Sequence, residues 1–573
     1  MPPKANTKAK VTKPAEPAKK TAATKKAPAK APATKAAATK KTATTKKATE
    51  APAKKNAATK KEPAKAPAKS AAPKATTSKR KREEEPEEAP AKKAKTTTTK
   101  KASAKTSAEK EAPSKPVKKV KALTKGAVIN EPPTERLHVF VFGEGTAGEL
   151  GLGTAKNAVD VKRPRLNPNL AADTVGVVQI AAGGMHVVAL THDNKILTWG
   201  VNDQGALGRD TEWEGGLKDM DEAQKEEDEE SDSDDDEDNN GLNPKESLPA
   251  EVDFTGVEVA EGTRWVQVAA GDSCSLALTD DGRVYGWGTF RGNEGTLGFT
   301  QEVETATRPM LLPDLKNITS IVAGANHALA LNKAGAVVAW GSGQQMQLGR
   351  RIIERSKLES LRPREFGLPK GPKNGIATIE TGAYHCFAIS KNGNVYSWGL
   401  NNYGETGIPD NAGQDDAAIK KPTIVEALQG KGVTNIKGGG HHSMAATENG
   451  DCLIWGRIDG AQGGFTSEEL QKMPEDVVMR DHRNDPRILL VPTKVEGVKG
   501  ATTKLAPGPE HNLVVTKEGK AWSWGFSANY QTGLGTEDDV LEPTLIDNSA
   551  VKEKALNGVF TGGQYSMLTA PAH

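Results

Sequence analysis

Six stretches of the chain share one pattern of apolar and polar positions. Each starts with an alternating apolar run such as HVVALT, crosses a short polar turn, and ends in a second apolar run that closes on Trp-Gly. Because successive side chains of a strand point to opposite faces, the pattern predicts a β-hairpin in every unit. The turn holds glycine in five units and Asn194 in the first. Both residues tolerate the left-handed backbone of a tight hairpin turn.

The tryptophan of each unit follows, thirteen positions later, a position that usually holds histidine. The pairs are His186 and Trp199, Cys274 and Trp287, His327 and Trp340, His385 and Trp398, His442 and Trp455, and His511 and Trp524. We expect these recurring residues to be structural, with Trp filling the space between units and His satisfying a buried backbone group. A functional site made of them is the less favoured alternative, so function should lie where the units differ.

A third extended piece follows each Trp-Gly run and predicts an outer strand. Proline near the start of these pieces suits a sheet edge. The pieces are residues 163–168, 248–254, 308–314, 421–427, 488–495 and 542–547.

The two ends of the repeat region indicate a closed ring. Residues 139–153 supply a Trp-Gly-like strand, with Phe142 and Gly143, that lacks its partner. Residues 559–569 supply a first strand, with Tyr565 in the His position, that lacks its Trp-Gly run. Together they complete a seventh unit. The sequence therefore predicts an all-β fold, a seven-bladed β-propeller over residues 137–569 closed by its N- and C-terminal strands.

Composition separates a tail from this propeller. Residues 1–125 hold 37 Lys+Arg against 10 Glu, which leaves 41 basic and 64 acidic residues for the rest, and no aromatic residue precedes Phe140. Such a segment cannot bury a core, so we expect residues 1–130 to form a disordered basic tail. Its Lys/Ala/Pro/Thr composition predicts non-specific binding to DNA phosphates.

The tail also carries candidate signals. A two-part nuclear import signal, which would bind importin, is formed by Lys79, Arg80, Lys81 and Arg82 with Lys92, Lys93 and Lys95. The opening Pro2-Pro3-Lys4 is similar to the motif for N-terminal methylation. No 18-residue apolar stretch and no apolar segment after Met1 occur. We therefore expect an intracellular protein without a membrane partner.

The units differ most just before the recurring His. That position holds Met185, Ser273, Asn326, Tyr384, His441, Glu510 and Gln564. Seven such loops would ring one face of the propeller and could dock a protein, the alternative being an ordinary solvated ring. The second unit adds two residues to its Trp-Gly loop, and this insertion, Phe290 to Gly295, predicts a short projecting hairpin.

Two charged segments interrupt the repeat. Residues 211–240 carry sixteen Asp+Glu against Lys218 and Lys225, so we expect a disordered acidic insertion over residues 211–243. It could instead screen the basic tail or bind histones. Residues 348–364 are basic and could meet an acidic protein surface.

The three cysteines, Cys274, Cys386 and Cys452, lie in apolar runs without metal-ligand spacing, so we expect small core residues. No triad or metal cluster is recognisable, and no cofactor is expected.

The units, together with HVFVFGEGTAGELGLG, AAGGMHVVALT, GVNDQGALGRDT, AAGDS, LTDDGRVYGWGTFR and GGGHHS, resemble the regulator of chromosome condensation family, the Ran exchange factors. The resemblance covers residues 137–569. It implies a GTPase-binding rim of Asp272, Asn326, His441 and His442, and an exchange wedge of Phe290, Arg291, Asn293 and Glu294. It also implies a histone-binding loop with Arg350, Arg351, Arg355, Arg362 and Arg364. The chain has Asn326 where the family has Asp, and Thr146 where the family often has Asp.

The resemblance implies a guanine-nucleotide exchange factor for Ran that acts on chromatin in the nucleus, for nucleocytoplasmic transport and mitosis. Its expected partners are Ran, histones in the nucleosome, DNA and importin, and the protein is expected to be a monomer. Because no bond is made or broken, no covalent catalytic residue is expected. The alternative is a chromatin or histone-binding propeller scaffold without exchange activity. A propeller hydrolase is disfavoured, since the rim loops hold no carboxylate or metal-ligand cluster.

Overall fold

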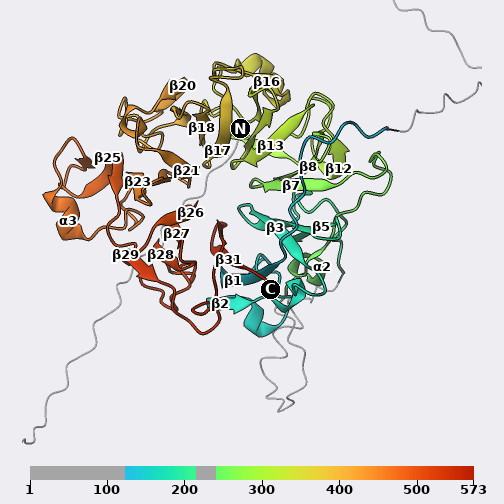
Figure 1. Cartoon of the computed structure of the whole chain (residues 1–573), viewed down its shortest axis with the longest axis horizontal. Helices are drawn as coiled ribbons and strands as arrows, with labels where there is room; N and C mark the ends of the chain where they lie inside the picture. The colour runs from blue at the N-terminus through green and yellow to red at the C-terminus, as the bar shows by residue number, and fades with distance from the viewer. Residues whose placement is uncertain (1–122, 215–240, 573) are drawn as a thin grey trace, which may run out of the picture. The chain divides into compact units, whose positions relative to one another are not determined.

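The computed structural model describes residues 123–214 and 241–572. The import signal, the methylation motif and most of the acidic insertion lie outside these residues. The described residues form seven sheets of four or five strands and one two-stranded sheet. Figure 1 shows the larger sheets set around one axis. This confirms the predicted seven-bladed propeller. We number the blades 1 to 6 from β3 onwards, and blade 7 contains both ends of the ring.

Each blade has four antiparallel strands, named here from the axis outwards. The innermost strands are β3 (Val177–Ala182), β7 (Trp265–Ala270), β13 (Ile318–Ala323), β17 (Ile376–Thr381), β21 (Val433–Gly438), β26 (Thr502–Pro507) and β30 (Gly558–Thr561). The second strands are β4 (His186–Thr191), β8 (Cys274–Thr279), β14 (His327–Asn332), β18 (His385–Ser390), β22 (His442–Thr447), β27 (His511–Thr516) and β31 (Tyr565–Pro571).

The Trp-Gly strands come third: β5 (Ile196–Gly200), β9 (Val284–Gly288), β15 (Val337–Gly341), β19 (Val395–Leu400), β23 (Cys452–Arg457), β28 (Ala521–Gly525) and β1 (Leu137–Glu144). The outer strands are β6 (Ala250–Glu251), β12 (Ala306–Leu311), β16 (Arg364–Glu365), β20 (Ala418–Ile424), β25 (Pro486–Lys494), β29 (Val540–Leu545) and β2 (Asp160–Leu166).

The remaining elements decorate this ring. They are the hairpin β10 (Phe290–Gly292) and β11 (Gly295–Gly298), β24 (Val478–Arg480) beside β25, the helices α2 (Pro244–Ser247) and α3 (Ser467–Lys472), and the 3-10 turns η1 (Lys156–Ala158), η2 (Pro168–Leu170), η3 (Glu354–Leu361) and η4 (Glu426–Leu428).

The sequence predicts three strands in each unit, but each blade has four, and the strand nearest the axis was not predicted. The innermost strand was missed because its polar positions break the apolar pattern. Polar side chains of the innermost strands form hydrogen bonds to the neighbouring blade. Gln267 donates through Nε2 to the Ile321 carbonyl at 2.8 Å and accepts the Ile321 N–H at 3.0 Å. Gln179 accepts the N–H of Val268 in the same way, at 2.9 Å.

The outer strands overlap all six predicted pieces, but β16 was not predicted. It has only two residues and follows the long basic loop of blade 3, so it leaves no pattern of its own.

Strands from the two ends of the ring close it. The β1 strand pairs antiparallel with β31, and Gly143 lies opposite Tyr565 in the register. The seventh blade is therefore shared between the two ends, as predicted. The hairpin turns follow the prediction too, since Asn194 has a φ of 71° and Gly282 a φ of 79°.

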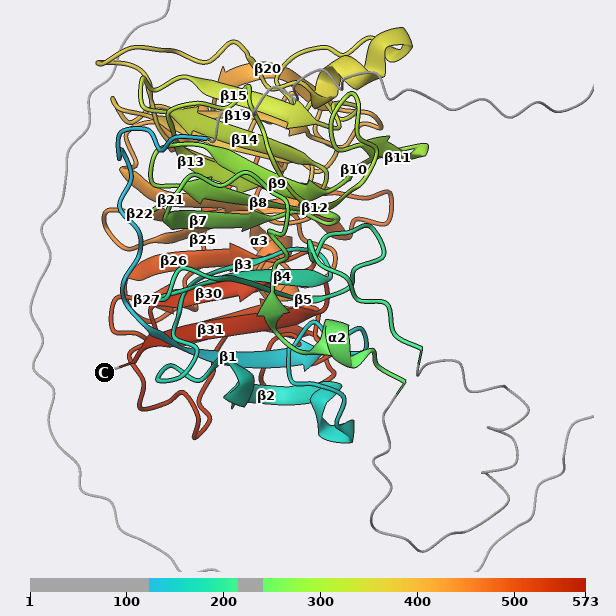
Figure 2. The same cartoon turned by 90° about the vertical axis from the view of Figure 1, so that its right-hand side faces the viewer.

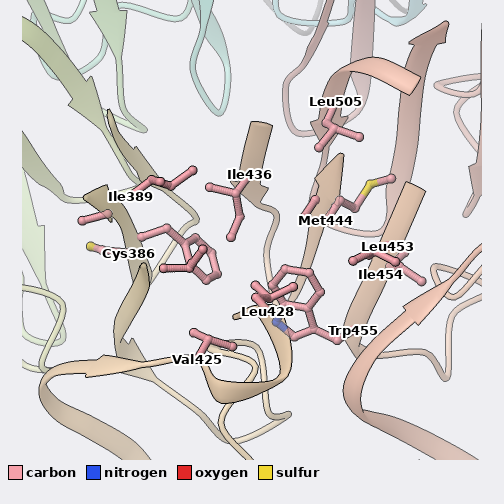
Figure 3. Close-up of a cluster of buried hydrophobic side chains, with 14 of the residues drawn as sticks. Cys386, Ile389, Val425, Leu428, Ile436, Met444, Leu453, Ile454, Trp455 and Leu505 are labelled. Carbon is pink, nitrogen blue, oxygen red and sulfur yellow. The ribbon is translucent and has the colours of Figure 1, made fainter. Parts of the chain in front are cut away.

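Buried tryptophans fill the space between blades, as Figure 3 shows for Trp455. Its Nε1 donates to the Glu405 carbonyl of the preceding blade at 3.0 Å. The recurring histidines also join blades. His385 Nε2 lies 2.7 Å from Ser443 Oγ, and that hydroxyl donates to the same Glu405 carbonyl at 2.8 Å. His therefore bonds a side chain of the next blade, and not a backbone group directly as expected.

This arrangement fixes the tautomer of the recurring histidines. Because the hydroxyl already donates to a carbonyl, it must accept from Nε2–H, and Nδ1 of His385 is buried without a partner. Burial lowers the pKa of His186 and His442 to about 4. The recurring His and Trp are thus confirmed as structural residues. All three cysteines are buried and free, as expected of core residues.

The folded part begins before residue 137. Lys125 pairs with Asp280 at 2.6 Å, and the N–H of Gly126 donates to Asp281 at 2.8 Å. The backbone N–H groups of Ile129 and Asn130 donate to the Asp280 carbonyl. Residues 124–130 are therefore held against blade 2, and we call them the strap.

Candidate functional site

Strand order places all the candidate loops on one face. In every blade the loop from the first to the second strand and the loop from the third to the fourth strand leave the sheet on the same side. We call this side the rim face. Figure 2 shows the β10–β11 hairpin and α2 on that side and the strap, in blue, on the other. The expected rim, wedge and basic loop therefore share one face.

Asp272 lies at the inner edge of the rim face, bound into a chain of contacts. Its N–H donates to the Ala325 carbonyl of blade 3 at 2.8 Å. Asn326 Nδ2 lies 3.5 Å from Asp272 Oδ2, and Asn326 Oδ1 accepts the N–H of Arg291 at 2.8 Å. Asn326 therefore links the rim carboxylate to the hairpin.

Asp272 is exposed as a residue, but the loops around its carboxyl exclude much of the water. This desolvation raises the pKa of Asp272, and the charge of Arg291 opposes the rise.

The expected wedge is a real hairpin, but its residues play different parts. Arg291, Asn293 and Glu294 are exposed at its tip, whereas Phe290 is fully buried and packs on Phe299. This burial contradicts the expectation that Phe290 belongs to the contact surface, since an apolar ring at the base of a hairpin anchors it. The tip is held by the Asn293 N–H, which donates to Gln344 at 2.6 Å.

The two adjacent histidines, His441 and His442, differ in exposure. His442 has no exposed surface, and its Nε2 lies 2.7 Å from Asn512 Oδ1 of the next blade. The burial contradicts its placement in the binding surface. His441 precedes the strand and is one third exposed, with 32% of its side-chain surface open. It is the member of the pair that is open to solvent.

Around His441 lie Tyr384, which the sequence places in the same varied ring, and three residues that sequence reasoning missed, Tyr403, Arg457 and Arg487. The ring of His441 lies 6.1 Å from that of Tyr384 and 5.1 Å from that of Tyr403. The guanidinium groups of Arg457 and Arg487 lie 5.4 Å and 5.2 Å from the Tyr403 ring centre. Such cation–π contacts hold this aromatic and cationic cluster together. Tyr403 stands in a Trp-Gly loop and Arg457 directly follows a Trp-Gly pair at the end of β23. Comparing these segments position by position would have found them.

The basic loop of blade 3 contains two kinds of arginine. Arg350 is half-buried, donates to the Ala339 carbonyl at 2.9 Å, and has its pKa lowered to about 10 by burial. Arg209 of blade 1 makes the matching bond to the Thr198 carbonyl, also at 2.9 Å. The Arg350 side chain is thus bonded to a strand of its own blade, and it is a poor candidate for a histone contact.

The other four arginines of this loop, Arg351, Arg355, Arg362 and Arg364, are exposed. Two of them are paired, Arg362 with Asp314 at 3.3 Å and Arg364 with Glu359 at 2.5 Å. The loop also contacts the hairpin, since Lys357 lies 2.5 Å from Glu294.

The acidic insertion leaves the rim face of blade 1 through two joined ends. Asn243 Nδ2 donates to the Thr211 carbonyl at 2.8 Å, and the Thr211 hydroxyl donates to Glu246 at 2.8 Å. Among the residues that the structure describes, no group of three or more His, Cys, Asp or Glu could hold a metal ion. Nor does that part of the chain contain a helix long and apolar enough to cross a membrane.

Comparison with known sequences points to one family. Residues 138–568 match the model of the RCC1-like domain. The chain is 41% identical over 443 residues to Protein pim1 of Schizosaccharomyces pombe, which covers 77% of this chain and 76% of that protein. It is 39% identical over 437 residues to Guanine nucleotide exchange factor SRM1 of Saccharomyces cerevisiae, which covers 75% and 86%.

Solved structures show the same propeller. Prp20p from Saccharomyces cerevisiae, whose crystal structure was described with its binding properties to Gsp1p and histones, has a TM-score of 0.67 and 36% identity, over 78% of this chain and 96% of that one. Yeast RCC1 (Prp20) bound to Kap60 has a TM-score of 0.67 and 35% identity, over 80% and 97%. The similarity in each case spans nearly the whole of the solved chain.

Proposed function

The chain belongs to the family of proteins built on the RCC1-like domain, and from this premise we propose that it is a guanine-nucleotide exchange factor for the small GTPase Ran, acting on chromatin. The observation that carries the proposal is the β10–β11 hairpin, which projects from the rim face and is linked through Asn326 to Asp272. A relative named as an exchange factor and a solved relative described as binding Gsp1p support it.

Exchange on this surface needs no covalent chemistry. A factor that binds the nucleotide-free GTPase more tightly than the loaded form weakens nucleotide binding by the same factor. In this proposal the GTPase docks on Asp272, Asn326 and His441. The hairpin tip, with Arg291, Asn293 and Glu294, makes contacts that only the nucleotide-free form can accept. Because no bond is made or broken, the protein is not an enzyme in the covalent sense.

Chromatin contact is assigned to other residues. The exposed arginines of the basic loop, Arg351, Arg355, Arg362 and Arg364, would meet an acidic histone surface, and the basic tail would bind DNA phosphates without reading sequence. The two-part basic signal of residues 79–95 would bind importin, in line with the Kap60 complex of yeast RCC1. These assignments place the protein in the nucleus, on chromatin.

The test is the release of fluorescent GDP from Ran by catalytic amounts of the full chain. We expect rapid release by the wild type and slow release by a variant whose tip, residues 291–294, is replaced by Asn-Gly. Lys333→Ala, an exposed turn residue on the opposite face, is the matched control. If the wild type does not accelerate release, the non-catalytic histone-binding scaffold becomes the better account.

A further inference from the structure

The Trp-Gly loops of five blades are closed by a Glu or Gln side chain. In each loop one side-chain oxygen accepts a backbone N–H from two residues earlier, at 2.7–2.9 Å. The acceptors are Glu149, Gln347, Glu405, Gln462 and Gln531. A single oxygen is enough for this bond, so the neutral amide serves as well as the carboxylate. Loop closure therefore does not require the two carboxylates that are buried in these loops, Glu149 in blade 7 and Glu405 in blade 4.

The second oxygen of Glu405 has a partner on the rim. Glu405 Oε2 accepts the N–H of Tyr403 at 2.7 Å, and Oε1 lies 3.4 Å from Nδ1 of His441. The Glu405 side chain has no exposed surface, whereas His441 is partly open to solvent. In blade 5 the corresponding second atom, Gln462 Nε2, is buried without any hydrogen-bond partner. In blade 4 the second atom of the closing side chain thus has a rim histidine within reach, whereas in blade 5 it has no partner.

We propose that Glu405 is a positioning residue, which holds the proton of His441 on Nδ1 so that the neutral ring presents Nε2 to the docked GTPase as a hydrogen-bond acceptor. An ionised carboxylate can only accept hydrogen bonds, so the contact requires a proton on Nδ1. A neutral imidazole carries a single N–H, which leaves Nε2 unprotonated. The identity of the partner rests on the proposed function, but the proton position does not.

This tautomer is the opposite of that in the structural histidines. His385 and the other recurring histidines donate through Nε2 and leave Nδ1 unpartnered. The rings of Tyr384 and Tyr403 both lie close to that of His441, at 6.1 Å and 5.1 Å, and restrict its rotation. The surface matched by Nε2 is therefore a donor of the GTPase, such as a backbone N–H, a hydroxyl or a lysine ammonium.

The test is Glu405→Gln, with Glu149→Gln as the matched control. Glutamine already closes three of the loops, so both variants keep the fold. In Glu405→Gln the amide oxygen still accepts the Tyr403 N–H, and the amide NH₂ turns to His441 Nδ1. That nitrogen must then accept, and the proton moves to Nε2. Long-range ¹H–¹⁵N NMR of the full chain reads the tautomer, and a His441→Ala spectrum assigns the signal.

We expect the Nδ1–H tautomer in the wild type and in Glu149→Gln, and the Nε2–H tautomer in Glu405→Gln. In the GDP-release assay we expect Glu405→Gln to raise the KM for Ran about threefold to tenfold, the size of one hydrogen bond, with kcat unchanged. An unchanged tautomer in Glu405→Gln, or an equal rise in KM in Glu149→Gln, would overturn the proposal. If the wild type does not promote release, the proposed function fails, and the NMR result still decides the role of Glu405.

Discussion

The ring of Phe290 stacks on that of Phe299, with the ring centres 5.9 Å apart and the planes inclined by 9°. Both rings are buried, so the projecting hairpin has an apolar anchor inside its own blade. The anchor and the exposed tip can therefore be changed separately.

We expect Phe290→Ala to cost about 3 to 5 kcal/mol of unfolding free energy, because it removes a buried aromatic side chain. It should also slow GDP release, since the tip loses its support. Phe290→Leu keeps most of the volume and should recover much of both. Denaturant unfolding and GDP release measure the two effects. Full exchange activity in a destabilised Phe290→Ala protein would show that the hairpin needs no anchor.

Asp272 predicts a pH dependence of stability. Its pKa is raised by desolvation, so the charged form is disfavoured in the folded state. The resulting destabilisation is absent below the ordinary Asp pKa and grows as the pH rises through the raised value. Asp272→Asn should therefore raise Tm at about pH 7 and leave it nearly unchanged at about pH 3.

Asp253 provides the control of opposite sign. Hydrogen bonds from Thr255, and to a smaller extent the charge of Arg308, lower the pKa of Asp253. The Asp253 carboxylate therefore stabilises the fold at neutral pH, and this stabilisation is lost in acid. Asp253→Asn should lower Tm at about pH 7 only. If both variants shift Tm in the same direction, the assignment for Asp272 is wrong.

The strap is expected to stabilise the ring. Asp280 has a side chain only 4% exposed, and Lys125 is its ion-pair partner. Lys125→Met would leave a buried carboxylate without its partner, at a cost of about 1 to 3 kcal/mol. Adding Asp280→Asn removes the charge and should recover part of that loss. Thermal unfolding of the single and double variants tests the ion pair. A second test compares chains that start at residue 123 and at residue 131, and equal stability of the two would argue against a stabilising strap.

The two kinds of arginine in the basic loop predict two kinds of phenotype. Arg351→Ala with Arg355→Ala removes exposed charge, so binding to histones should weaken while Tm stays within about 1 °C. Arg350→Ala removes a half-buried blade contact, so Tm should fall. Histone pull-down and calorimetry separate these effects. A loss of histone binding by Arg350→Ala at unchanged Tm would reverse the assignment.

The repeat alone predicted the blades, their closure and the structural role of His and Trp, because these features recur at fixed spacing. It missed the innermost strands, whose Gln267 and Gln179 interrupt the apolar pattern while making the bonds between blades. A polar residue in a strand is ambiguous in sequence, since the partner that satisfies it lies in another unit.

The same ambiguity explains the errors at the site. His441 and His442 are adjacent in sequence, but the first ends a loop and the second begins a buried strand, so they cannot share a surface. In the sequence Arg350 is one of a run of charged residues, and its burial and its bond to the Ala339 carbonyl separate it from Arg351 only in the structure. Glu405 was not predicted as a site residue because its side chain accepts the same loop-closing hydrogen bond as glutamine in other loops. Its contact with His441 is visible only in the structure.

The pairing of β1 with β31 has a consequence for synthesis on the ribosome. The β1 strand is made early, and the strand that pairs with it on one side, Tyr565–Pro571, is made only after the six other blades. Until then the nascent chain keeps an unpaired strand edge, which is a site for wrong association. Translation speed and chaperone supply, acting on the last blade, should therefore limit the yield of folded protein more than the stability of any single blade.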